Sequence, residues 1–135
     1  MHHAPTSAEA KFLLDAGFQE QLDYFLSRAM ECEEIWGLSN ASGWVMRESG
    51  ETTCLPVWNY AVMADACAIG ELSDYAANST SLEHFVFDIL PQLREMEVDV
   101  ELLAIPERQG ILLTAKALFE IFERKLDAAA YFPEG

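Results

Sequence analysis

The chain has 135 residues, of which 51% are hydrophobic, 23 are acidic and 8 are basic, so its formal net charge is −15. This length suits a single domain over residues 1 to 135 and is too short for two. The negative charge repels nucleic acid and anionic membranes, so a basic or apolar protein is the expected partner. Because no signal-peptide pattern and no apolar run of about 18 residues occurs, we expect a soluble, cytoplasmic protein.

The first predicted helix spans about residues 8 to 33. Thr6 and Glu9 have the spacing of a capping box, in which two side chains satisfy the first free N–H groups of a helix. An apolar stripe with helical periodicity follows. Gly17 lies inside this segment and either divides it into two helices or is tolerated at a cost of about 1 kcal/mol. Both alternatives are open.

All three tryptophans fall between residues 35 and 58, in three predicted strands. The connections at residues 40 to 43 and 49 to 50 consist of turn-forming residues, which predicts an antiparallel meander. In the second strand, alternation places Arg47 on the opposite face from Trp44. Both faces carry apolar residues, so we expect the sheet to be covered at least in part on each side.

A further helix is predicted near residues 59 to 69, capped by Asn59 and closed by Gly70. Asp65 is its only charged residue. A helix that is apolar on every side is typically packed against several neighbours, so we expect this one to be buried. The polar segment from residues 73 to 79 is interpreted as a link.

The clearest helical stripe predicts a helix over residues 81 to 95. Thr80 and Glu83 repeat the capping-box spacing at its start. Pro91 falls on the opposite face, so the helix is expected to continue through it with a kink toward solvent. Phe87 also lies off the stripe, and its ring needs a second contact either within the fold or on a partner.

The last third of the chain predicts a hairpin and a helix. Residues 98 to 102 alternate, residues 106 to 110 form the turn and residues 111 to 113 return, after which Thr114 caps a helix over residues 115 to 128. Together these elements predict an α+β domain, in which one antiparallel sheet of about five strands, meander plus hairpin, packs with about four helices.

Several short motifs follow one another along the chain: a Trp-x-Leu strand, a Gly-Trp-Val strand, a Leu-Pro-Val-Trp strand, an alanine-rich helix and a Ser-Leu-Glu-x-Phe helix that ends in Leu-Pro-x-Leu. In this order, over about residues 18 to 126, the chain resembles a bacterial family catalogued as domain of unknown function 2750. The resemblance is carried by Trp36, Leu38, Gly43, Trp44, Val45, Pro56, Val57, Trp58, Ala61, Leu82, Phe85, Leu90, Pro91 and Leu93. It implies a small stand-alone bacterial protein with no assigned chemistry.

No catalytic residue, metal site or cofactor is predicted. The acidic clusters at residues 31 to 34 and 48 to 51 lie at a helix end and a turn, where carboxylates stay hydrated, whereas acid–base catalysis needs one in a dry pocket. The three cysteines have neither redox-pair nor zinc-site spacing. Cys54 or Cys67 could form a nucleophile pair with His84 only if the fold joined them, and both thiols are expected to be buried and slow to react.

The two ends, residues 1 to 6 and 129 to 135, are expected to fray. Met1-His2-His3 can in principle hold Cu(II) or Ni(II) through its amine, amide and imidazole nitrogens, but the favoured interpretation is a tail with incidental affinity.

Arg47 and the aromatic residues around the third strand form the candidate binding site. A guanidinium near Trp44, Trp58 and Tyr60 can stack on a ring and bind a carboxylate or phosphate. The favoured alternative is an arginine that neutralises its own acidic neighbours, such as Glu48.

Two functions from different classes follow. The leading one is a non-enzymatic interaction or regulatory protein whose acidic surface binds a basic partner, with toxin neutralisation as one form. The alternative is a small-molecule-binding, anion-binding or enzymatic domain with a pocket near Arg47 and Trp58. A deep, partly apolar cleft with convergent polar groups favours the alternative, and a convex acidic surface favours the leading function. Trp58 is expected to matter more for folding than for binding.

Overall fold

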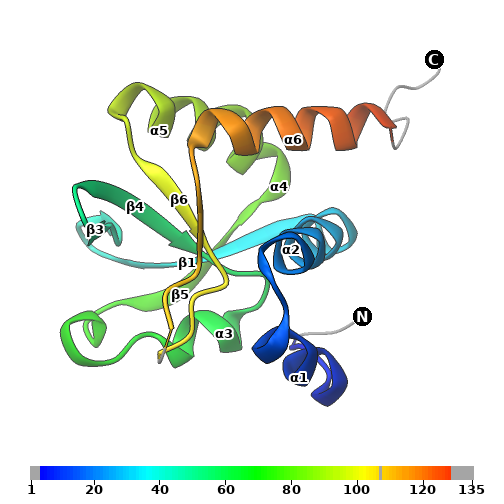
Figure 1. Cartoon of the computed structure of the whole chain (residues 1–135). Coiled ribbons are helices and arrows are strands. Elements are labelled where there is room, and N and C mark those ends of the chain that lie inside the picture. Colours follow the sequence, from blue (N-terminus) through cyan, green and yellow to red (C-terminus); the bar gives the residue numbers. More distant parts are fainter. Residues whose placement is uncertain (1–3, 107, 129–135) are drawn as a thin grey trace.

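The computed structural model describes residues 4–106 and 108–128, and Figure 1 shows its strands at the centre with helices around them. The helical elements are α1 (Ser7–Asp15), α2 (Phe18–Cys32), α3 (Ala61–Ala66), the 3-10 turn η1 (Gly70–Leu72), α4 (Leu82–His84), the π-helical turn η2 (Phe85–Ile89), α5 (Leu90–Met96) and α6 (Ala115–Ala128). The strands are β1 (Glu34–Asn40), β2 (Gly43–Trp44), β3 (Arg47–Ser49), β4 (Thr52–Val57), β5 (Ala76–Ser81), β6 (Asp99–Leu102) and β7 (Ile111–Leu113). The predicted α+β class is confirmed.

The strands form two sheets, and the prediction of one antiparallel sheet was wrong. One sheet is antiparallel, in the order β2-β1-β5, whereas the other has the order β3-β4-β6-β7 and pairs β4 with β6 in parallel. The long connection from β4 to β6 passes through α3, β5 and the helices α4 and α5. A crossover of this length allows two strands to run in the same direction, which a hairpin does not.

The predicted meander is divided between the two sheets. β2 ends at Trp44 and pairs with β1, whereas β3 begins at Arg47 and pairs with β4. Between them Val45 is 2% exposed, and its N–H donates to the carbonyl of Leu38 at 2.8 Å. An antiparallel bridge between Trp36 and Trp58 connects the two sheets. The chain therefore crosses from one sheet to the other at Val45 and Met46.

The segment predicted to be a polar link, residues 73 to 79, contains the first part of strand β5, which continues to Ser81. Each of its residues pairs with β1, from Ala76 opposite Ser39 to Ser81 opposite Glu34. The prediction failed because alanine, asparagine and serine carry little strand propensity of their own. Their pairing is a contact with a distant segment, which the local pattern does not reveal.

Helix α3 is shorter and more exposed than predicted. It spans Ala61–Ala66, Tyr60 rather than Asn59 is its N-cap, and Val62 is 50% exposed. Ile69 lies beyond the helix and is 57% exposed. The prediction of full burial failed because alanine side chains remove little apolar surface from water, so one face packed against a sheet satisfies this helix.

The amino-terminal segment forms two helices. The hydroxyl of Thr6 accepts the N–H of Glu9 at 3.1 Å, which confirms the predicted capping box. α1 ends before Gly17 and α2 begins after it, and the carboxylate of Glu20 accepts the Gly17 N–H at 2.9 Å. Of the two alternatives that the sequence left open, the divided helix is the observed one.

One helical segment runs from Leu82 to Met96 and continues past Pro91, as predicted. Its cap is Ser81 rather than Thr80, because the Ser81 hydroxyl accepts the N–H three residues further along at 3.1 Å. The wide π-helical turn before Pro91 gives room to the proline ring, which in a regular α-helix would press on the carbonyl four residues back. Pro91 is exposed, so the irregular turn faces solvent.

The main core lies between the helices and the second sheet. Phe122 of α6 makes edge-to-face contacts with Phe25 and Phe85, each with ring centroids 6.4 Å apart. Phe87 is 49% exposed and contacts Phe119 in the same way at 6.2 Å, so its second contact is within the fold. A smaller cluster surrounds the buried Trp58. Within the part of the chain that the structure describes, no helix is both long and apolar enough to cross a membrane.

The predicted hairpin and final helix are confirmed. β6 and β7 are antiparallel neighbours, and the Thr114 hydroxyl accepts the N–H of Ala117 at 3.0 Å at the start of α6. The expected fraying at residues 129 to 135 lies outside the described residues, as does the nitrogen set of residues 1 to 3, which was not the favoured interpretation.

Candidate functional site

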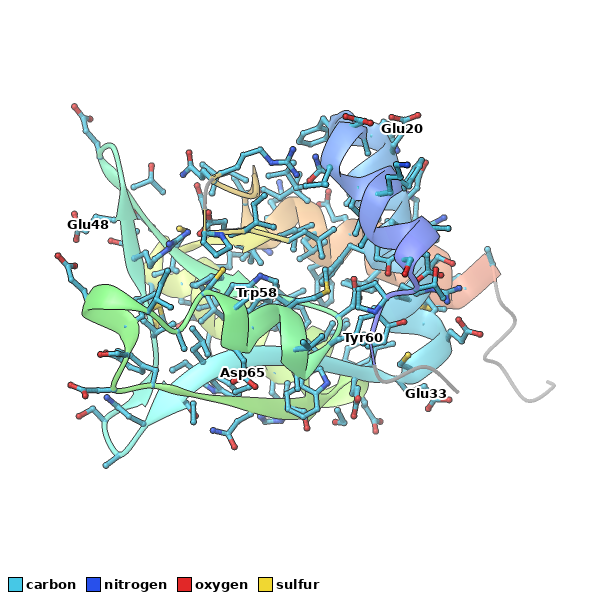
Figure 2. All side chains as sticks on the ribbon, turned by 90° about the horizontal axis from the view of Figure 1, so that it is seen from below. Glu20, Glu33, Glu48, Trp58, Tyr60 and Asp65 are labelled. Atoms are coloured by element: carbon cyan, nitrogen blue, oxygen red, sulfur yellow. The ribbon has the colours of Figure 1, made fainter. Side chains whose placement is uncertain are left out.

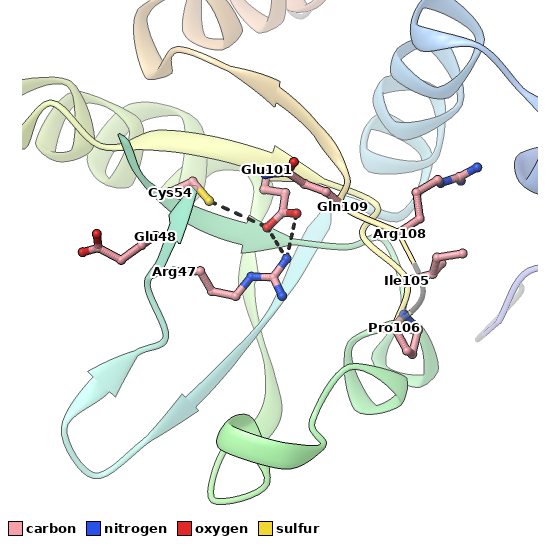
Figure 3. Close-up of a pocket in the computed structure, with 8 residues that line it drawn as sticks. All are labelled: Arg47, Glu48, Cys54, Glu101, Ile105, Pro106, Arg108 and Gln109. Atoms are coloured by element: carbon pink, nitrogen blue, oxygen red, sulfur yellow. Dashed lines mark hydrogen bonds and ion pairs between the residues drawn. The ribbon is translucent and has the colours of Figure 1, made fainter. Parts of the chain in front are cut away.

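Arg47 reaches across one strand to a partner on another. It begins β3, at the edge of the second sheet, and its register partner on β4 is Cys54. The next strand in the sheet is β6, which carries Glu101. Figure 3 shows the Arg47 guanidinium and the Cys54 thiol both directed at the Glu101 carboxylate.

The Glu101 carboxylate is fully buried and has a partner for each oxygen. Nη2 of Arg47 lies 2.6 Å from one oxygen and 2.7 Å from the other, and the Gly110 N–H donates to Oε2 at 2.8 Å. The Cys54 thiol donates to Oε1 at 3.7 Å. A charge with 0% exposure is tolerated in a protein only when it is paired in this way. The carboxylate therefore ties β3, β4 and the β6–β7 loop together.

Gly110 has a steric reason to be glycine. A Cβ at this position would overlap the carbonyl of Leu102 on the neighbouring strand. The close approach of the two backbones brings the Gly110 N–H within reach of the Glu101 carboxylate. The β6–β7 loop is thus anchored directly beside the ion pair.

The electrostatic environment keeps Cys54 protonated. Burial and the neighbouring negative charge of Glu101 raise the pKa of the Cys54 thiol to about 11. Burial alone would lower the pKa of Arg47, but the hydrogen bond and charge of Glu101 outweigh it and raise that pKa. At neutral pH the site therefore consists of a thiol, a guanidinium cation and its carboxylate, and Cys54 is a poor nucleophile.

Two adjoining hollows flank Arg47, with volumes of about 300 Å³ and about 500 Å³. We call them together the Arg47 groove. Both are lined by Arg47, Glu48, Ile105 and Pro106. The smaller hollow adds Cys54, Glu101, Arg108 and Gln109. The larger hollow adds Met46, Cys67, Ile69, Glu71 and Leu72.

Arg47 is the one member of the predicted site that lines this groove. Trp58 is 1% exposed, lies in the middle of the molecule (Figure 2), and its indole N–H donates to the Ala104 carbonyl at 2.7 Å. Tyr60 is 2% exposed, and burial raises its pKa. Trp44 is half-buried against the main core, 3.0 Å from where a Cβ on Gly37 would stand. The three aromatic residues thus belong to the core or its margin and do not line the groove.

Glu101 is the residue that the sequence did not single out. The favoured partners of Arg47 were its neighbours, Glu48 among them, but the observed partner is Glu101, 54 residues away. Strict alternation suggested a half-exposed strand, whereas β6 is a central strand between β4 and β7. The apolar run that follows Glu101, starting with Leu102, is typical of such a buried strand and was the available signal.

The other candidate groups do not form a reactive site. Nδ1 of His84 lies 2.8 Å from the Asp88 carboxylate on an exposed helix face, whereas the Cys54 thiol contacts Glu101. In residues 4–106 and 108–128, no cluster of histidine, cysteine and acidic side chains has an arrangement that could hold a metal ion. Arg108 donates to the carbonyls of Leu13 and Leu14 and thereby docks the end of α1.

The fold and site define a small α+β domain with an open groove beside a buried arginine–glutamate pair. A family described as "Protein of unknown function (DUF2750)" matches residues 22–121, so the chain belongs to this family, as the motifs suggested. The matched segment includes both sheets and every residue of the Arg47 groove, and it leaves out α1. A comparison with curated proteins found no match.

Proposed function

We propose that this protein is a non-enzymatic binding protein whose Arg47 groove holds a basic, partly apolar segment of a partner protein. The observation that carries the proposal is the lining of the larger hollow. Met46 and Ile69 are 39% and 57% exposed there, beside the exposed carboxylates of Glu48 and Glu71. Apolar side chains next to acidic ones match lysine or arginine residues interspersed with apolar residues.

Charge supports the same choice of partner. Among the residues that the structure describes, neither Glu48 nor Glu71 has an ion-pair partner. Glu48 projects from the margin of the molecule in Figure 2. With a net charge of −15, the whole surface attracts cations over long range, and the two carboxylates then hold them locally.

The buried ion pair supports the proposal by fixing the shape of the groove. Glu101 binds Arg47, which lines both hollows, and also the N–H of Gly110 in the β6–β7 loop, the loop that carries the lining residues Ile105 and Pro106. A groove that is already formed loses less conformational entropy on binding. A toxin that presents a basic, apolar segment is one partner of this kind.

The test uses a fluorescein-labelled peptide of alternating leucine and lysine, with an alternating leucine and glutamate peptide as its control. We expect Glu48→Lys with Glu71→Lys to weaken anisotropy-detected binding of the lysine peptide by about tenfold or more, because two attractions become repulsions. Glu95→Lys with Glu123→Lys changes the net charge equally at exposed sites outside the groove and is the matched control. Equal losses in both double variants would show that binding depends on net charge alone.

A second candidate is a small ligand with a carbonyl or carboxylate in the smaller hollow. Its support is that Nη1 and Nε of Arg47 make no hydrogen bond to the described residues, and Figure 3 shows part of the guanidinium turned away from Glu101. The charges of Arg47 and Arg108 in this hollow are balanced by those of Glu48 and Glu101, so a neutral acceptor fits it better than an anion. Acetamide and acetate titrations followed by NMR at Arg47 distinguish the two ligands. Tighter acetate binding would contradict this argument.

A further inference from the structure

The first sheet has an unusually open edge at β5. The edge strands of the two sheets are β2, β3, β5 and β7. β5 has 6 residues, whereas β2 has 2 and β3 and β7 have 3 each. In Figure 2, β5 runs along the lower margin of the molecule, outside β1. Among the strands of residues 4–106 and 108–128, it is therefore the one edge long enough to pair regularly with another strand.

The register shows which backbone groups face outward. Trp36 of β1 exchanges two backbone hydrogen bonds with Trp58, so its N–H and carbonyl point away from β5. In an antiparallel pair, a residue opposite such a position also points its backbone away from its neighbour. Ser79 lies opposite Trp36, and its N–H and carbonyl thus face the free edge.

Ala77 faces the same way. It lies opposite Leu38, whose carbonyl accepts the Val45 N–H on the far side of β1. Within residues 4–106 and 108–128, the outward N–H and carbonyl groups of Ala77 and Ser79 have no hydrogen-bond partner. Ala77 and Ser79 therefore offer two N–H donors and two carbonyl acceptors to an incoming strand.

β5 also lacks the features that normally protect a sheet edge. Lysine, proline, bulges and inward-pointing charges usually prevent pairing with another chain. From residue 75 to residue 82 the sequence has no charged residue and no proline, and β5 pairs with β1 without a break in register. Ala76, Asn78, Ser79 and Ser81 are exposed. Small exposed side chains leave the backbone accessible.

We infer that β5 is a strand-addition site, to which a partner protein contributes an extended segment. The segment has an uncharged centre and a lysine or arginine at each end, because Asp74 and Glu83 flank β5 and neither has an ion-pair partner among the described residues. A second copy of this chain is a worse occupant, since it brings the same two carboxylates and a further charge of −15. The inference rests on β5 and is independent of the Arg47 groove.

The first test measures amide hydrogen exchange at Ala77 and Ser79 by NMR. The probe is the peptide Lys-Thr-Val-Thr-Val-Thr-Lys at about 1 mM, a concentration suited to weak peptide binding. Its control has the same side chains but is N-methylated at the five central residues, which removes their backbone donors. We expect the unmodified peptide to slow exchange at both amides by about tenfold and the methylated peptide to have no effect.

The second test separates binding from folding. Ser79→Pro removes an outward N–H and is expected to reduce peptide binding by about tenfold while the melting temperature stays close to that of the parent. Asn78→Pro removes an N–H that faces β1 and should lower the melting temperature instead. Asp74→Asn with Glu83→Gln leaves the backbone unchanged. This double variant should bind the peptide severalfold more weakly, and its binding should depend less on salt.

Two results would overturn the inference. One is unchanged exchange at Ala77 and Ser79 with both peptides, which would mean that the edge does not accept a strand. The other is slow exchange that depends on protein concentration without peptide, together with a dimer mass in sedimentation. That outcome would make a second copy the occupant.

Discussion

Trp58 and Glu101 are both almost completely buried, yet they stabilise the fold in opposite ways. Trp58 is 1% exposed and contributes apolar surface plus one hydrogen bond to the Ala104 carbonyl. Glu101 is 0% exposed and depends on the cation of Arg47. Truncating the first residue leaves a cavity, whereas removing the partner of the second leaves a buried charge. The two residues are equally buried, yet we expect them to respond differently to substitution, to a compensating second substitution and to pH.

The largest expected effect is that of Trp58→Ala, which should lower the free energy of unfolding by about 3 to 5 kcal/mol. The indole fills the smaller core cluster, and its loss leaves the Ala104 carbonyl with only the weak thiol donor of Cys67 at 3.4 Å. Chemical denaturation measures the change. Trp58→Phe, which keeps most of the ring area, should be much less destabilising. If Trp58→Ala folded normally and lost a partner, the ring would be a binding residue after all.

Arg47→Ala should cost about 3 kcal/mol, the lower end of the range for breaking a buried pair, because the Arg47 side chain is 35% exposed. A purely surface arginine would contribute less than about 0.5 kcal/mol. A double-mutant cycle tests the cause. Glu101→Leu in the Arg47→Ala background should restore most of the stability, since no buried charge remains. A double variant less stable than Arg47→Ala would show that packing, not charge, is responsible.

The third effect concerns Cys54 and appears only above about pH 8. The pKa of its thiol is raised to about 11 in the folded state, so the folded protein holds its proton at pH values where the unfolded chain has released it. The stabilisation is fully present below the unfolded pKa of about 8.5 and is lost as the pH rises toward 11, about 3 kcal/mol in all. Denaturation of the parent and of Cys54→Ala between pH 8 and pH 11 isolates this contribution. A parallel pH dependence in the two proteins would contradict it.

The same shift predicts slow chemistry at Cys54. Labelling by iodoacetamide at neutral pH should be much slower in the native than in the unfolded protein, with Cys32, which is partly exposed, as the internal comparison. Rapid native labelling of Cys54 would reopen the case for catalysis.

Part of the candidate site could be predicted from sequence. Arg47 was singled out because it is a cation on a strand among tryptophans, and that position does line the groove. Trp44, Trp58 and Tyr60 were grouped with it because they are close in sequence, but packing turns them into the core or its margin. Glu101 was missed because its role depends on the parallel pairing of β4 with β6.

Features that depend on neighbouring residues could be predicted from the sequence. The capping box at Thr6, the cap at Thr114, the β6–β7 hairpin and the helix through Pro91 all follow from local steric and hydrogen-bonding preferences. The family motifs and the charge of −15 were equally readable. The caps, the turn and the helix depend on residues close together in sequence, and the charge depends on composition alone.

Tertiary structure alone decided which strands meet. The pairing of β5 with β1, and of β4 with β6, joins segments separated by tens of residues. Such pairing is chosen by the total surface buried and by the backbone groups satisfied, not by the propensity of either strand. The same choice buried Glu101, gave Arg47 its partner and left the outer edge of β5 open.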